Sequence, residues 1–265
     1  MASKKKNLDL NKIFKKLNIK KGDKILVSSN LLEILMKLKK INQKFDGNLL
    51  INFLIKKVGP EGTLLFPTFN WDFCSGKDFN YKKTKSRCGA LTNIALNRTD
   101  FKRTKNPIFS FAVTGKDTDY ICNLKHSNCF GHNSPFGYLI KNNGKNIFIG
   151  MDYKDGFAFV HLAEEKIGVD YRYLKFFSGN YINSANKKRK KKYSLYVRNL
   201  KTNIESTIID KKFDKVLIKK KAVQKKIING INFALVDIKN TYKLMIKDIK
   251  NKEGLIYPKK KQNNE

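Results

Sequence analysis

The run K-I-L-V-S-S at Lys24–Ser29 has the composition of a buried strand and ends in two hydroxyl side chains. A helical pattern follows at 31–38, and a second helical pattern covers about 47–58. The turn G-P-E-G then leads into T-L-L-F-P-T at 63–68, a second apolar run that Pro67 stops. Because strand, helix and strand alternate here, the sequence predicts a parallel sheet with helices on its faces.

Hydroxyl side chains stand where both of these strands end. Ser28 and Ser29 close the first run, and Thr68 closes the second. In open α/β sheets, ligands bind beyond the carboxyl ends of the strands, so we expect a binding site at this edge. The alternative for each residue taken alone is a helix cap or a turn.

Further helices and strands are predicted before and after residues 24–68. Short helices are expected at 8–17, 89–97 and 116–123, and further strands at about 103–115 and 146–150. The loop at 70–87 is long and carries four aromatic residues, so we expect it to be ordered over a ligand rather than disordered. These aromatic residues are Trp71, Phe73, Phe79 and Tyr81.

The last hundred residues have a different pattern. The basic run K-K-R-K-K-K at 187–192 leads directly into alternating apolar residues, which is typical of the exposed flank of a hairpin; a nucleic-acid patch or a targeting signal is the alternative. A strand at 234–238 and a helix at 241–250 follow, and 259–265 should fray. We therefore predict a single α/β domain over 1–265 with a mixed, largely parallel sheet flanked by helices. Its core spans about 20–175, and an antiparallel addition spans about 176–240.

The charge of the chain is strongly positive. It has 56 Lys and Arg against 22 Asp and Glu, a formal net charge of +34. Such a field attracts nucleic acids, anionic membranes and phosphorylated small molecules, although a compositional preference for Lys and Asn explains the excess equally well. The aromatic residues lie in apolar runs or in one loop rather than between basic residues, so nucleic-acid binding is the less favoured function.

The four cysteines show no C-x-x-C pair, so the sequence predicts neither a zinc site nor a disulfide framework. The first residues lack the apolar core of a signal peptide, and no apolar run approaches the roughly 20 residues that span a bilayer. We expect a cytoplasmic protein without a metal and without a membrane partner.

The stretch D-G-F-A-F-V-H-L-A-E-E-K-I-G at 155–168 predicts a helix that Asp155 caps and Gly168 ends. His161 and Glu164 are three residues apart and would share one face of it. Imidazole accepts protons near neutral pH, and a neighbouring carboxylate can orient the ring. A surface helix with an incidental histidine is the alternative, and we expect surface positions for His126 and His132.

Taken together, seven segments in order resemble the aminoglycoside 3-N-acetyltransferase family of acyl-CoA-dependent enzymes. They are G-D-K-I-L-V-S-S at 22–29, G-P-E-G-T-L-L-F-P-T at 59–68, S-R-C-G-A-L-T at 86–92, N-P-I-F-S-F-A-V-T-G at 106–115, N-S-P-F-G-Y-L at 133–139, I-F-I-G at 147–150 and F-V-H-L-A-E at 159–164. The resemblance covers about 20–175 and weakens after that.

The resemblance implies an α/β fold that binds coenzyme A and transfers an acyl group to an amine. It makes His161 the general base and Glu164 its carboxylate neighbour. The coenzyme would be bound by Ser28, Ser29, Thr68 and Ser110. We expect direct attack of the amine on the thioester in a ternary complex. Backbone or hydroxyl groups near Ser28 would then stabilise the oxyanion.

The expected substrate depends on the positive charge of the chain and on one difference from the family's sequence pattern. Family members that modify antibiotics are expected to hold a polycationic drug with carboxylates, and this chain is short of carboxylates throughout. We therefore expect a nucleotide-linked amino sugar of surface polysaccharide synthesis, with aminoglycoside acetylation as the alternative. Trp71, Arg87, Asn106 and Arg172 are the expected substrate-binding residues, and Arg103 is a further candidate for a pyrophosphate. Asn106 replaces the histidine of the family's H-P-x-x-S pattern, so a catalytically inactive relative is a further alternative. The sequence does not determine the oligomeric state, and a homodimer is one alternative.

Overall fold

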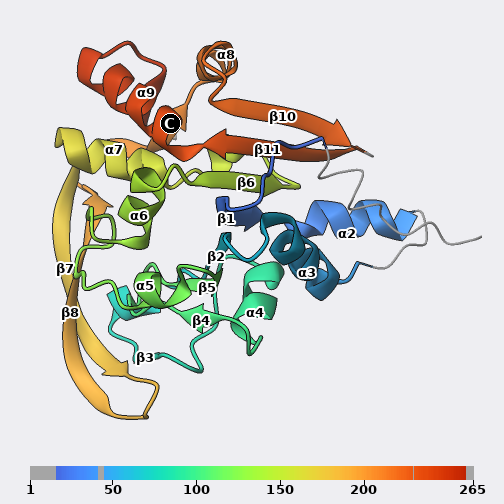
Figure 1. Ribbon diagram of the computed structural model, residues 1–265. Helices are drawn as coiled ribbons and strands as arrows, with labels where there is room; N and C mark the ends of the chain where they lie inside the picture. The colour runs from blue at the N-terminus through green and yellow to red at the C-terminus, as the bar shows by residue number, and fades with distance from the viewer. Residues whose placement is uncertain (1–15, 41–44, 229, 261–265) are drawn as a thin grey trace, which may run out of the picture.

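The computed structural model describes residues 16–40, 45–228 and 230–260. Its centre is a seven-stranded sheet with the order β10-β11-β6-β1-β2-β5-β4. The three central strands run parallel, and they are β6 (Lys145–Ile149), β1 (Lys24–Ser29) and β2 (Thr63–Pro67) (Figure 1). The strand–helix–strand pattern at the start of the chain thus builds the middle of the sheet.

The outer strands of the sheet are antiparallel to their neighbours. They are β5 (Phe111–Gly115) and β4 (Lys102–Arg103) on one side, and β11 (Ile231–Asp237) and β10 (Val223–Ile228) on the other. The predicted α/β fold with a mixed sheet flanked by helices is confirmed, with the parallel pairing in its centre. Part of the late addition extends this same sheet.

Alternation along the central strands separates two apolar layers. In β1, Ile25 and Val27 face one layer and Leu26 faces the other, as a strand period of two requires. The first layer is covered by α2 (Leu31–Lys40), α3 (Gly47–Val58) and α4 (Ala90–Leu96). The second is covered by α5 (Thr118–Cys122), α6 (Pro135–Lys141), α7 (Phe159–Ile167), α8 (Lys211–Lys219) and α9 (Ile238–Asn251).

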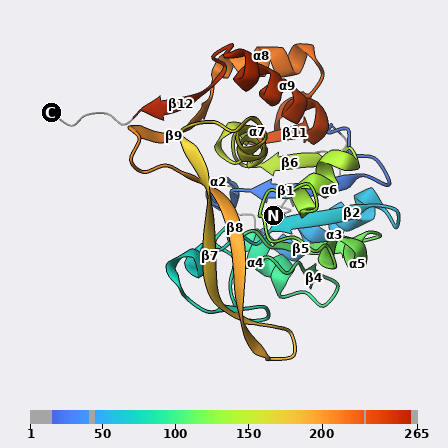
Figure 2. The ribbon, with the colours of Figure 1, turned by 90° about the vertical axis from the view of Figure 1, so that its left-hand side faces the viewer.

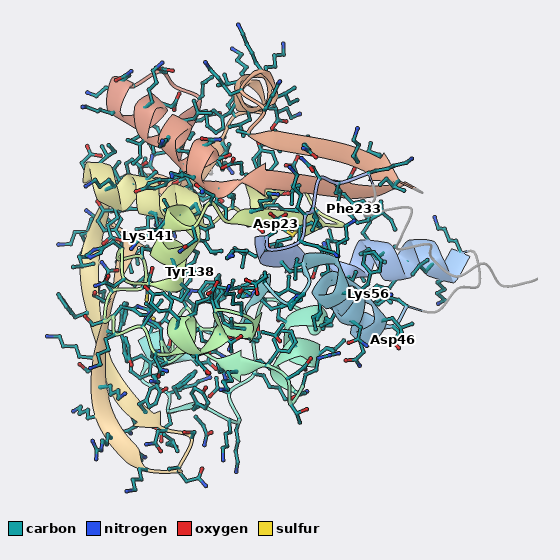
Figure 3. The ribbon with its side chains drawn as sticks, in the orientation of Figure 1. Asp23, Asp46, Lys56, Tyr138, Lys141 and Phe233 are labelled. Carbon is teal, nitrogen blue, oxygen red and sulfur yellow. The ribbon has the colours of Figure 1, made fainter. Side chains whose placement is uncertain are left out.

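Helix ends follow local capping chemistry. Asp46 accepts hydrogen bonds from two backbone N–H groups at the start of α3, and Lys56 lies in the last turn of that helix (Figure 3). Ser134 caps α6, and Pro135 stands at its first position, where its missing N–H costs nothing. The predicted cap of α7 is wrong. Asp155 ends a short 3-10 helix, η2 (Tyr153–Asp155), and α7 begins only at Phe159, although it does end at Gly168 with a φ of 75°.

The late residues add two small sheets. A long hairpin of β7 (Arg172–Ile182) and β8 (Lys188–Arg198) pairs with β3 (Phe79–Asn80), which lies in the ordered loop after β2 (Figure 2). The basic run lies in β8, with its first residues exposed. The second small sheet pairs β9 (Ile204–Ile209) with β12 (Ile256–Lys260).

The two ends of the chain differ in how far the structure describes them. The tail was expected to fray from Lys259, but Lys259 and Lys260 belong to β12 and pair with Ser206 and Ile204. The helix predicted over 8–17 lies almost wholly outside the described residues. Among the residues that the structure describes, no helix combines the length and hydropathy needed to cross a bilayer.

Candidate functional site

A cavity of about 890 Å³ opens where the central strands end. Ser28 and Ser29 of β1 and Pro67 of β2 lie on its wall, together with His161 of α7 and Arg172 of β7. The cavity is therefore at the carboxyl edge of the parallel strands, where ligands collect in folds of this kind. The late hairpin supplies its outer wall.

His161 and Glu164 form a hydrogen-bonded pair on this wall. The distance from His161 Nδ1 to Glu164 Oε2 is 2.7 Å. The histidine side chain is 31% exposed, whereas the glutamate side chain is fully buried. If Nδ1 carries the proton that Glu164 accepts, the lone pair of the neutral ring is on Nε2, which is the arrangement of an oriented general base.

Three further groups contact the Glu164 carboxylate. Tyr171 donates its hydroxyl to Oε1 at 2.9 Å, and the Thr207 hydroxyl donates to the same oxygen. Arg172 Nε lies 2.7 Å from Oε2; this is an ion pair rather than a hydrogen bond, because the N–H is not directed at the oxygen. Burial alone would raise the pKa of Glu164, but contacts with His161, Arg172 and Thr207 hold that pKa below its ordinary value. The carboxylate is therefore ionised.

Aromatic rings form much of the cavity wall next to the histidine. The Phe130 ring centroid is 6.0 Å from that of His161, and Phe130 packs on Phe109 at 5.0 Å. Trp71 meets Phe109 edge to face at 6.2 Å and is 44% exposed. The same wall includes Phe69 and Phe136. Because such a wall displaces water, electrostatic interactions at the dyad are strengthened.

The charged side chains on the wall are mostly cations, and they are Arg87, Lys154, Arg172 and Arg198, against the carboxylates Asp155 and Glu205. Most are already paired: Arg87 with Asp72 at 2.6 Å, Lys154 with Asp152 at 2.7 Å, and Glu205 with Lys259 at 2.7 Å. Within the described part of the chain, Arg198 has no carboxylate within 4.0 Å, so it is the wall cation most available to an anionic ligand.

Two of the residues predicted to bind the coenzyme lie away from the cavity. Thr68 and Ser110 are fully buried, and their hydroxyl oxygens are 2.9 Å apart. Arg103 donates to the Ser110 hydroxyl at 3.0 Å and to the Thr68 carbonyl at 3.3 Å. The backbone pairing of Thr68 with Ser110 turns both side chains into this buried network, so neither is on the cavity wall.

Asn106, predicted to bind substrate, is also buried and is not on the wall. Its Oδ1 accepts from the backbone N–H groups of Ile108 and Phe109, each at 2.9 Å. Its Nδ2 has no hydrogen-bond partner among the described residues. In this structure, Asn106 shapes the turn that presents the Phe109 ring to the cavity.

Ser28, Ser29, Trp71, Arg87, His161 and Arg172 are thus the predicted residues that the fold brings together. Sequence reasoning did not find Tyr171 and Thr207, which hold the Glu164 carboxylate, or Lys154, Arg198 and Glu205 on the wall. Thr207 comes from a strand that the sequence did not predict and is 43 residues from Glu164. No group of His, Cys, Asp and Glu within the described ranges is arranged to hold a metal ion.

The fold and the site together define an α/β protein with a hydrogen-bonded histidine–glutamate pair at a large cavity on the edge of its sheet. Comparison with known families identifies it further. The chain belongs to the aminoglycoside 3-N-acetyltransferase family, whose model matches residues 35–249, well over half of its length. The resemblance predicted from the sequence is therefore confirmed.

Individual relatives agree with this assignment. The chain is 27% identical over 179 residues to the SPbeta prophage-derived aminoglycoside N(3')-acetyltransferase-like protein YokD of Bacillus subtilis (strain 168). That match covers 58% of this chain and 62% of YokD, which is less than two thirds of the relative's length.

Solved structures show the same fold. Aminoglycoside acetyltransferase AAC(3)-Xa matches with a TM-score of 0.74 and 15% identity over 91% of this chain and 90% of its own. AAC-IIIb in its binary complex with CoASH matches with a TM-score of 0.71 and 15% identity over 90% of this chain and 94% of its own.

Proposed function

We propose that this protein is an acyl-CoA-dependent N-acyltransferase that acts on the amine of an amino sugar. The observation that carries the proposal is the His161–Glu164 pair, which lies on the wall of the strand-end cavity. Family membership supports it, and so does the structure of AAC-IIIb solved with CoASH. Lys154 and Arg198 are wall cations that would meet the anionic part of coenzyme A.

The proposed chemistry uses the dyad as a general base. His161 Nε2 accepts the proton of the acceptor amine as its nitrogen attacks the thioester carbonyl. The new C–N bond forms, the C–S bond breaks, and the thiol of coenzyme A leaves. Glu164 holds the ring through Nδ1 and stabilises the imidazolium that forms. Ser28 and Ser29 lie on the same wall, where hydroxyl or backbone groups would stabilise the oxyanion.

An aminoglycoside is the first candidate acceptor, because the family and the relatives favour it over the nucleotide-linked amino sugar that the charge had suggested. The nucleotide-linked sugar is the second candidate, favoured by one observation. The cavity wall carries four cationic side chains against two carboxylates, an excess that attracts an anionic acceptor and repels a polycation.

Thiol release from acetyl-CoA tests the function. The purified protein is mixed with acetyl-CoA and, in parallel, with sisomicin or with a uridine diphosphate amino sugar, and products are identified by mass spectrometry. We expect acceptor-dependent release with one class and only slow hydrolysis without acceptor. No release with either class would contradict the proposal.

The base assignment is tested by His161→Ala. General base catalysis is worth about 10²- to 10⁴-fold, so turnover should fall by that order while acetyl-CoA affinity changes little. His132→Ala is the matched control, because His132 is exposed and lies outside the cavity wall. A folded His161→Ala protein with wild-type turnover would remove His161 from the mechanism.

A further inference from the structure

Glu164 Oε2 is shared between two groups that can carry positive charge. His161 Nδ1 and Arg172 Nε both lie 2.7 Å from it. The glutamate side chain is 0% exposed and the arginine side chain 11% exposed. The charges therefore interact with little screening by water.

A buried carboxylate without a cation would hold a proton on the neighbouring imidazole, because opposite charges at this distance favour the charged form of each group. An imidazolium ring cannot accept the proton of an amine. When Arg172 already balances the charge of the carboxylate, the carboxylate stabilises the imidazolium form of His161 less strongly. The hydrogen bond between the ring and the carboxylate is kept. A permanently charged guanidinium is suited to this task.

We propose that Arg172 is a positioning residue: it is the counter-ion of Glu164, and it balances that carboxylate so that the His161 ring can act as a base. This inference rests on the proposed function. It replaces the expected role of Arg172 in substrate binding. The guanidinium is committed to Glu164, and its Nη2 also donates to the Thr207 hydroxyl at 3.4 Å.

The other groups around the dyad do not supply this charge. Tyr171 and Thr207 donate neutral hydrogen bonds to Glu164, and burial raises the pKa of Tyr171, which keeps it protonated. On α7 itself, Glu165 accepts from Asn128 at 2.5 Å, and burial raises its pKa. Tyr196 is a phenol whose hydroxyl donates to the Val169 carbonyl at 2.8 Å. Two further cations lie on the cavity wall, but Lys154 pairs with Asp152 and Asp214, and Arg198 forms no ion pair with Glu164. Among the described residues, Arg172 is thus the permanent cation paired with Glu164.

The kinetic test uses Arg172→Met, Arg172→Gln and Arg172→Lys. Loss of the positive charge should lower kcat/KM about two- to threefold at pH 7, and the loss should shrink as the pH is raised. Arg172→Lys keeps the charge and should keep the wild-type pH profile. A uniform loss at every pH would indicate a merely structural role and would overturn the proposal.

A spectroscopic test does not depend on activity. The chain has three histidines, so histidine-selective ¹⁵N labelling gives a simple spectrum in which His161→Ala identifies the ring of interest. In Arg172→Gln and Arg172→Met, the spectrum should show His161 taking up its proton at a higher pH than in the wild type, and in Arg172→Lys it should match the wild-type spectrum. His132 serves as the internal reference.

The two tests separate two kinds of failure. Unchanged protonation of His161 in a folded Arg172→Gln protein would overturn the role of Arg172, whatever the activity. Absence of acyl transfer in the wild type, together with the expected shift in the spectrum, would overturn the proposed function and leave the counter-ion in place. Gln retains a hydrogen-bond donor toward Glu164, so this variant tests the charge even where Met does not fold.

Discussion

Glu164 makes a contribution to the stability of the fold that depends on pH. Its carboxylate accepts from His161, Tyr171 and Thr207 and is fully buried. Burial alone would raise its folded-state pKa, but contacts with His161, Arg172 and Thr207 hold that pKa below the ordinary value of 4.5. A carboxyl group with a lowered folded-state pKa stabilises the fold above its unfolded pKa, and that contribution is lost as the pH falls through the folded pKa.

We therefore expect the melting temperature of the wild type to exceed that of Glu164→Gln at pH 7 and the difference to shrink below about pH 4.5. Circular dichroism melts of the two proteins from pH 7 to pH 3 measure it. Asp119→Asn is the control, because Asp119 makes an exposed ion pair with Lys102. A difference that stays constant over this range would mean that folding does not lower the pKa of the Glu164 carboxyl.

The network of Thr68, Ser110 and Arg103 has a structural role in the fold. Arg103 is 5% exposed, lies 4.7 Å over the Phe79 ring and donates to the Thr84 carbonyl at 2.6 Å. Desolvation lowers its pKa to about 10, so it remains charged at neutral pH. Each hydrogen bond that Arg103 donates therefore stabilises a charged guanidinium that is buried away from water.

Ser110→Ala should lower the free energy of unfolding by about 1–3 kcal/mol, because the Arg103 Nε–H loses its acceptor, and should leave the KM for acetyl-CoA within about twofold. Urea titration and thiol-release kinetics measure the two quantities. Ser178→Ala, at an exposed position of β7, is the control. A large rise in KM at unchanged stability would instead support the coenzyme-binding role expected from the sequence.

Among the elements, the small sheet of β9 and β12 completes the site. β9 carries Thr207, which donates to Glu164, and β12 covers β9. The carboxylate of Asp248 in α9 anchors the start of β12 by accepting from the backbone N–H groups of Leu255 at 3.1 Å and Ile256 at 2.7 Å. Asp248 is 2% exposed, so this anchor is buried.

Asp248→Ala should destabilise the protein by about 1–3 kcal/mol, since two buried N–H groups lose their acceptor. It should also increase hydrogen exchange in β12 and β9 before other strands. Hydrogen exchange read by mass spectrometry checks this. Asp119→Ala serves as the control, because exposed ion pairs contribute little. Exchange that rises evenly across all strands would argue against a local anchor.

The elements also show what could be predicted from the sequence. β1, β2, β6, α3, α4 and α9 were predictable because their apolar residues recur with the period of a strand or helix. β10 and β12 were not predicted, because these edge strands expose at least half of their side chains and their sequences resemble lysine-rich loops. His161 and Glu164 were predictable because one helical turn joins them, whereas Thr207 reaches them only through the tertiary fold.

The positive charge acts on the scale of the whole molecule. The formal net charge is +34, and four cations line the cavity. Such a field raises the local concentration of an anion and is screened by salt, with a Debye length of about 10 Å at 0.1 M. The charge is therefore expected to speed the capture of acetyl-CoA.

We expect kcat/KM for acetyl-CoA to fall several-fold between about 20 mM and about 300 mM NaCl while kcat changes little. Initial-rate measurements at fixed acceptor concentration check this. Arg198→Gln, which removes the wall cation without an ion-pair partner among the described residues, should flatten the dependence, and Lys201→Gln outside the wall should not. A kcat/KM independent of salt in the wild type would mean that the charge excess does not serve the coenzyme.

One consequence concerns how the protein is made. The carboxylate that orients His161 is held by a threonine in β9, and β9 is covered by residues 256–260. Thr207 comes after every segment that carries the family resemblance, so a nascent chain shorter than about 207 residues has His161 and Glu164 but lacks a contact that holds the carboxylate. In such a chain β12, which pairs with β9, is also still missing.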